Sequence, residues 1–143
     1  MTYKRILIAL DEEPSAENVA RQGLELGKQL KAEIAVVSVA NTKELHTAGS
    51  VTPDELAEII RKDTRENQTK ILDIVFRDYE VTQFVEEGKP YEIILKIAED
   101  WKADILVIGS HSNNGLFQAL LGSVFEKLVK NSEIPVFLVN TAE

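Results

Sequence analysis

The chain contains no cysteine, and this absence excludes several kinds of chemistry. Disulfide bonds, a thiolate nucleophile and zinc sites with cysteine ligands are all ruled out. A protein without cysteine also fits the reducing environment of the cytosol. We therefore expect a cytoplasmic location.

Long apolar runs and an excess of basic residues are also missing. The first apolar run, Ile6 to Leu10, is too short for a signal peptide, and no later run could span a bilayer. The chain has 16 Lys and Arg residues and 24 Asp and Glu residues, which gives a formal net charge of −8. This charge argues against a general surface for nucleic acid or anionic membrane, so we expect neither as a partner.

What is present is typical of one globular α/β domain. The chain has 143 residues, of which 44% are hydrophobic, so we expect a single domain over residues 1–143. Short apolar runs alternate with amphipathic stretches, and the runs lack the polar alternation of a half-exposed strand. This pattern predicts a doubly wound parallel sheet with helices on both faces and right-handed crossovers. The expected strands are Ile6 to Leu10, Ile34 to Val39, Val81 to Val85, Ile105 to Ile108 and Pro135 to Val139.

Several helix starts are visible in the sequence. Thr52, Pro53 and Glu55 have the spacing of an N-cap, a first helical residue and a capping box, so a helix should run from there to about Asp78. Other helices are expected after Ser15, from Pro90, and from Ser123 to about Asn131. In the helix after Thr52, the residues expected to face inward are Leu56, Ile59, Ile60, Ile71 and Val75.

The stretch from Asp104 to Ser123 carries the main functional signal. The apolar run Ile105 to Ile108 stops at Gly109, a polar loop follows, and Gly122 and Ser123 open a helix. A buried strand, a glycine-bearing loop and a helix N-terminus form the phosphate site of many α/β proteins. The alternative is purely structural: both glycines would serve turns, and Ser123 would only cap the helix.

These residues resemble the universal stress protein family. The first strand ends in Asp11, and Gly88-Lys89-Pro90 precedes the third helix. The C-terminal third carries the more specific part, namely Gly109-Ser110-His111, then Leu120-Leu121-Gly122-Ser123, then Pro135-Val136. The resemblance covers nearly the whole chain. It implies a five-stranded parallel sheet of order 3-2-1-4-5, with ligands at the carboxyl ends of the strands where that order reverses.

The resemblance also implies a nucleotide site and its residues. The ATP-binding branch has a Gly, two residues, Gly, nine residues, Gly and Ser or Thr motif, which falls on Gly109, Ser112, Gly122 and Ser123. Asp11 would lie by the adenosine, and the backbone of Val39 would hydrogen-bond to the adenine. The implied ligand is ATP, with or without Mg²⁺, and no metal ligands of the protein are assigned. The full candidate set is Ala9, Asp11, Val39, Gly109, His111, Ser112, Asn113, Gly115, Gly122, Ser123 and Val124.

Three departures from the family pattern keep a second hypothesis open. Ser112 replaces a glycine, Asn113 stands where many members carry Arg or Lys, and Glu12 and Glu13 follow Asp11. A nucleotide-independent interaction protein of the same fold would explain all three. Under either hypothesis the resemblance implies a homodimer through the last strand, Pro135 to Val139, which is otherwise an unprotected apolar edge.

An enzyme is the third class, and it has the least support. The adenylyl-transferring relatives of this kind of fold need a His-x-x-His or Ser-Gly-Gly-x-Asp-Ser motif, and neither occurs in the chain. His111 has no evident nucleophile beside it in the motif. We therefore expect no catalytic residues and at most weak ATP hydrolysis, in a stress-response regulatory protein.

Overall fold

The computed structural model describes residues 2–11, 15–42, 49–110 and 126–140. A helix at residues 126–131 precedes the last strand. Strands and helices alternate as the sequence predicts. Their bounds are β1 Arg5–Ala9, α1 Ser15–Leu30, β2 Glu33–Ala40, α2 Pro53–Val75, β3 Val81–Glu87, α3 Pro90–Trp101, β4 Ile105–Gly109 and β5 Val136–Val139.

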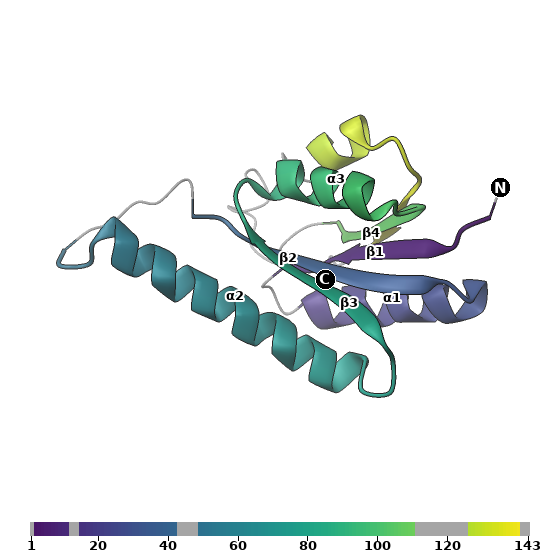
Figure 1. Cartoon of the computed structure of the whole chain (residues 1–143), viewed down its shortest axis with the longest axis horizontal. Helices are drawn as coiled ribbons and strands as arrows, with labels where there is room; N and C mark the ends of the chain where they lie inside the picture. Colours follow the sequence, from purple (N-terminus) through teal and green to yellow (C-terminus); the bar gives the residue numbers. More distant parts are fainter. Residues whose placement is uncertain (1, 12–14, 43–48, 111–125, 141–143) are drawn as a thin grey trace.

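The five strands form one parallel sheet of order β3-β2-β1-β4-β5. Helices α1 and α2 lie on one face of this sheet, and α3 lies on the other face with the helix at 126–131 (Figure 1). The predicted fold class and strand order are therefore confirmed.

The central strand β1 is buried on both faces. Ile6, Leu7 and Ile8 have no exposed surface. Ile6 and Ile8 pack in the layer of α1, whereas Leu7 packs in the layer of α3. This two-sided burial explains why the centre of the strand is a continuous apolar run, since none of these three residues faces water.

Helix α1 lies close to the sheet because two of its residues lack a side chain. A Cβ atom on Gly27 would come within 2.5 Å of Ile34 Cδ1, and one on Gly23 would collide with the side chain of Ile8. Both glycines are buried. The pair therefore lets the helix backbone approach β1 and β2 closely, a role that hydrophobic periodicity does not reveal.

The start of α2 agrees with the sequence, but its inward face does not. Thr52 caps the helix, and its Oγ1 accepts a hydrogen bond of 3.1 Å from the Glu55 amide. Ile59, expected to face inward, is 51% exposed, so that prediction is wrong. The helix also ends earlier than the expected Asp78. Its buried residues are Ala57, Thr64, Gln68 and Val75.

Polar contacts explain this difference. The Gln68 side chain is 3% exposed, and its Nε2 donates to Ser38 Oγ at 3.0 Å and to the Phe84 carbonyl at 2.9 Å. Gln68 thus joins α2 to both β2 and β3. Hydrophobic periodicity in the sequence identifies only apolar inward residues, so it cannot detect a helix face that contacts the sheet through a side-chain amide such as that of Gln68. Among the described helices, none is both long enough and apolar enough to cross a membrane.

Replacing Gln68 with Ala should lower the free energy of unfolding by about 1–3 kcal/mol, because the Phe84 carbonyl and the Ser38 hydroxyl would lose a buried partner. Urea unfolding measures this cost. Gln29→Ala is the matched control, since Gln29 is exposed and donates to Glu25 of the same helix. Equal unfolding midpoints for the two variants would contradict the assigned role of Gln68.

Candidate functional site

At the carboxyl edge of the sheet, β1 ends before both of its neighbours. Its pairing with β4 stops at Ile8 opposite Val107, whereas β4 continues along β5 as far as Gly109. Its pairing with β2 stops at Ala9, whereas β2 continues along β3 to Ala40. This edge is also where the strand order reverses between β1 and β4. It is the place where open α/β sheets bind ligands.

The backbone of Val39 points toward the β1 side of β2. The Val37 carbonyl accepts from the Leu10 amide on that side, at 2.9 Å, and the Ala40 carbonyl accepts from the Gly88 amide on the β3 side, at 3.1 Å. In a parallel strand, the backbone groups of successive residues alternate between the two neighbours. The N–H and C=O of Val39 are therefore directed past the end of β1.

The same alternation applies to Gly109, at the end of β4, on the other side of the place where the strand order reverses (the switch point of the sheet). The amide of Ser110 donates to the Val139 carbonyl at 2.9 Å, which places the Ser110 backbone on the β5 side. Gly109 therefore turns its N–H and C=O toward the β1 side, past the last paired residue Val107. Two strands far apart in sequence thus direct backbone donors and acceptors to one place.

The structure places four of the predicted site residues at this edge. Ala9, Val39 and Gly109 are half-buried at or near the ends of their strands, and Asp11 is exposed just beyond β1. The other predicted contacts lie outside the described residues, as do the acidic residues that follow Asp11. They are His111, Ser112, Asn113, Gly115, Gly122, Ser123 and Val124, together with Glu12 and Glu13.

A charged cluster that the sequence did not reveal lies at the same edge, where β3 ends beside α2. Glu87 Oε2 accepts from Arg61 Nε at 2.6 Å, and Glu87 Oε1 accepts from Thr42 Oγ1 at 3.1 Å. Arg61 also contacts Glu58 within α2, at 3.0 Å. Arg61 and Glu87 line a cavity of about 220 Å³ with Ala40, Arg65, Val85 and Glu86. In the sequence, the acidic pair Glu86 and Glu87 is the one local sign of this cluster, because Arg61 is distant in sequence.

The hydrogen bond from Arg61 holds the pKa of the Glu87 carboxyl below its ordinary value, and the Thr42 hydroxyl acts in the same direction. A lowered pKa means that the contact is intact at neutral pH. It would be lost only as the pH falls below the ordinary carboxyl range. Within the described ranges, no group of three or more His, Asp or Glu residues could hold a metal ion.

Comparison with known proteins agrees with this architecture. The model of the universal stress protein family matches residues 2–140. The chain belongs to this family. It is 32% identical to the universal stress protein MJ0531 of Methanocaldococcus jannaschii, over 96% of this chain and 82% of that protein. It is 33% identical to MJ0577 of the same organism, over 96% and 94% of the two chains.

Solved structures show the same fold. The structure of MJ0577 superposes with a TM-score of 0.80 at 30% identity, covering 100% of this chain and 99% of that one. A universal stress protein from Archaeoglobus fulgidus, solved in complex with dAMP, gives a TM-score of 0.65 at 22% identity. That alignment covers 96% of this chain and 98% of the other. At this identity the likeness shows a shared fold.

Gly88 follows β3, and its amide donates a hydrogen bond to Ala40 of β2. Its backbone has a conformation that other residues rarely adopt. Its φ is 143°, and a Cβ atom there would lie 2.9 Å from Ile93 Cγ1. We expect Gly88→Ala to lower the free energy of unfolding by about 1–3 kcal/mol. Gly49→Ala is the control, because nothing lies within 4 Å of its new Cβ atom and only its φ of 78° is strained. Urea midpoints compare the two, and an equal or greater loss in Gly49→Ala would refute the steric argument.

Proposed function

We propose that this universal stress protein is a stress-response regulator that binds ATP or a related adenine nucleotide at the switch point of the sheet. One observation carries the proposal. Val39 and Gly109 stand on either side of the end of β1, and both direct backbone donors and acceptors toward it. Such a pair of strand ends suits a planar base on one side and a phosphate chain on the other.

The two sides have different tasks in this proposal. Adenine offers an amino donor and ring-nitrogen acceptors on its edges, which match the C=O and N–H of Val39. The phosphates would lie beyond Gly109, where the sequence predicts a helix start at Gly122 and Ser123, since a helix N-terminus favours an anion. Asp11, just beyond β1, is suited to a ribose hydroxyl. Mg²⁺, if it is bound, enters with the phosphates, because it prefers phosphate and water oxygens.

The comparisons support this assignment at the level of the fold. The Archaeoglobus fulgidus protein, whose structure contains dAMP, has the same architecture. No catalytic role is assigned to any residue of the chain. Binding and any regulatory change that follows it need no covalent step, so we propose a regulator rather than an enzyme, with at most weak hydrolysis of ATP.

Gly122→Val should weaken ATP binding by about tenfold or more while the urea midpoint changes little. A branched side chain beside the helix start would occupy the space that a phosphate needs. Calorimetry measures the affinity of the wild type and of the variant, and mass spectrometry of the molecules released on denaturation identifies any nucleotide that copurifies. A folded variant with wild-type affinity would show that Gly122 serves only a turn.

A nucleotide-independent interaction protein is the second candidate. It is favoured by the departures from the family pattern: Ser112 replaces a glycine, Asn113 replaces a cation, and Glu12 and Glu13, which follow Asp11 in the sequence, add negative charge. This candidate predicts no heat of ATP binding in the wild type and no copurified nucleotide. The same two measurements therefore separate the candidates.

We also propose that the protein pairs as a homodimer through β5. Within the part of the chain that the structure describes, this strand pairs only with β4, so its other side is an open edge. Phe137 is 39% exposed and Leu138 is 45% exposed, and Val129 of the preceding helix is 48% exposed. An apolar edge strand of this kind is suited to a second copy of the same chain.

Phe137→Lys should weaken the homodimer by about tenfold or more, because it places a charge in the apolar contact. Light scattering over a concentration series measures the change. Ile74→Lys is the matched control, since Ile74 is 45% exposed but lies on α2. A wild type that stays monomeric at micromolar concentration would contradict the dimer, as would an equal effect of both substitutions.

A further inference from the structure

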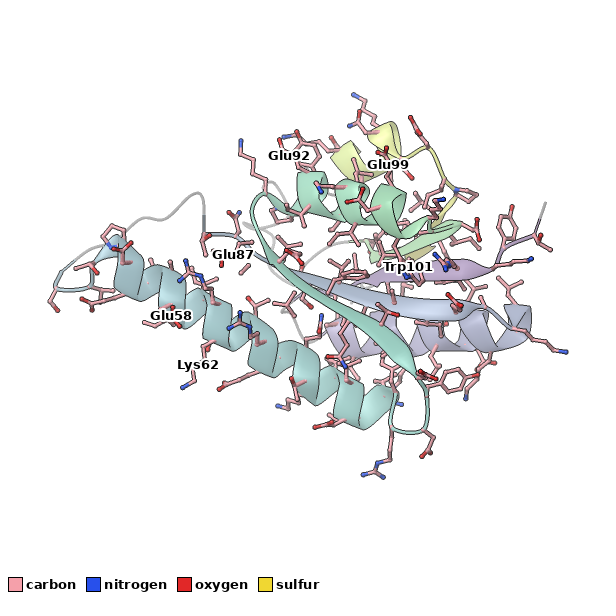
Figure 2. The ribbon with its side chains drawn as sticks, viewed as in Figure 1. Glu58, Lys62, Glu87, Glu92, Glu99 and Trp101 are labelled. Carbon is pink, nitrogen blue, oxygen red and sulfur yellow. The ribbon has the colours of Figure 1, made fainter. Side chains whose placement is uncertain are left out.

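One carboxylate joins three segments at the edge of the sheet. Glu87 is the last residue of β3, and it accepts a hydrogen bond from Thr42, which follows β2, and another from Arg61 of α2. Figure 2 shows Glu87 at the end of β3, beside the part of α2 that carries Glu58. Its two oxygens thus face two different elements. The side chain therefore ties the end of β2 to α2.

The backbone next to this carboxylate is held as well. Ala40 pairs with Glu87, and Val39 pairs with Glu86. The Ala40 carbonyl accepts from the Thr42 amide at 3.0 Å and from the Gly88 amide at 3.1 Å. The residue that follows Val39 is thus fixed through its carbonyl, while the Thr42 side chain holds the segment to Glu87.

Helix α2 supplies a rigid anchor for the carboxylate. Arg61 contacts both Glu58 and Glu87. Farther along the same helix, the buried Gln68 amide fixes α2 to β2 and β3. The side chains of Arg61 and Glu87 are 33% and 42% exposed. Ion pairs this exposed contribute little to stability. The contact is therefore better suited to fixing a position than to stabilising the fold.

The position that it fixes is that of the Val39 carbonyl. A peptide unit is planar, so the Val39 C=O and the Ala40 N–H turn together. Movement at Ala40 therefore redirects the Val39 C=O, which points past the end of β1. A carbonyl held there accepts from the 6-amino group of adenine, whereas it would face the 6-oxygen of guanine, which is also an acceptor. Discrimination between the bases depends on how firmly this carbonyl is held.

We propose that Glu87 is a positioning residue that sets the preference of the site for adenine over guanine, by holding the strand end that presents Val39. The inference rests on the proposed function, since it assigns the base selectivity of the same site. Glu87 itself is assigned no contact with the nucleotide. It acts through Thr42 and Ala40.

The test compares the affinities of ATP and GTP for the wild type and for two variants. Glu87→Gln keeps an oxygen for Thr42 but loses the charge that binds Arg61. The ratio of ATP to GTP affinity should fall by about fivefold, roughly the effect of one hydrogen bond. Asp100→Asn is the control, because it breaks another surface ion pair, with Lys96 at 3.0 Å, on the opposite face of the sheet. It should leave the ratio unchanged.

Hydrogen exchange of the nucleotide-free protein provides an independent readout. The amides of Thr42 and Gly88, which both donate to the Ala40 carbonyl, should exchange faster in Glu87→Gln than in Asp100→Asn or the wild type. The urea midpoints of all three proteins should agree closely. This combination separates a loss of position at the strand end from a general loss of stability.

Each outcome decides the matter. A lower ratio with faster exchange at Thr42 and Gly88 supports the inference. If the wild type binds ATP and the Glu87→Gln variant has the same ratio of ATP to GTP affinity, the inference is overturned but the proposed function is not. Equal losses of ATP and GTP affinity with a lower urea midpoint overturn it as well, since Glu87 would then be merely structural. A wild type that binds neither nucleotide overturns the proposed function and, with it, the inference.

Discussion

The burial of β1 on both faces is the constraint on which the rest of the structure depends. Ile6, Leu7 and Ile8 are entirely removed from water, and each such side chain contributes about 1.5–3 kcal/mol of hydrophobic stabilisation. A strand of this kind needs a helix layer on each side. Right-handed crossovers then place α1 and α2 on one face and α3 on the other, which reverses the strand order beside β1.

The proposed site at this reversal is made mainly of backbone. Among the described residues, no strand continues between β2 and β4 past the end of β1, and Val39 and Gly109 turn their peptide groups toward that position. Backbone groups have no rotamers to lose, so binding through them needs little side-chain ordering. What side chains add in this account is control of position. Gln68 and Glu87 both tie α2 to the strands that present the site.

The sequence predicts most of the fold because its signals are local. The apolar run of β1 and the cap at Thr52 each depend on neighbouring residues, and both agree with the structure. Ile59 was misplaced because the inward face of α2 is partly polar, and Gln68 reaches partners that hydrophobic periodicity cannot detect. The contact between Arg61 and Glu87 has the same origin, since it joins residues that come together only in the folded chain.

The candidate site could be predicted only in part from the sequence, and mainly through the family resemblance. The resemblance to a family supplied the strand order, and this order brings the ends of β1, β2 and β4 together. Ala9, Val39 and Gly109 therefore lie at this edge of the sheet, and their contacts with a nucleotide stay predictions. The direction of the Val39 and Gly109 peptide groups follows from strand register, which a sequence alone does not define. The contacts expected from Ser112 and Gly122 stay predictions.

The central claim is that Val39 and Gly109 bracket one adenine-nucleotide site, and amide NMR during an ATP titration tests it most directly. The resonances of Val39 and Gly109 should shift together along one binding curve. The amides of Arg5 and Asp104, at the opposite edge of the sheet, should stay unchanged. Shifts that follow different curves, or that leave Val39 and Gly109 unmoved at saturating ATP, would contradict the account.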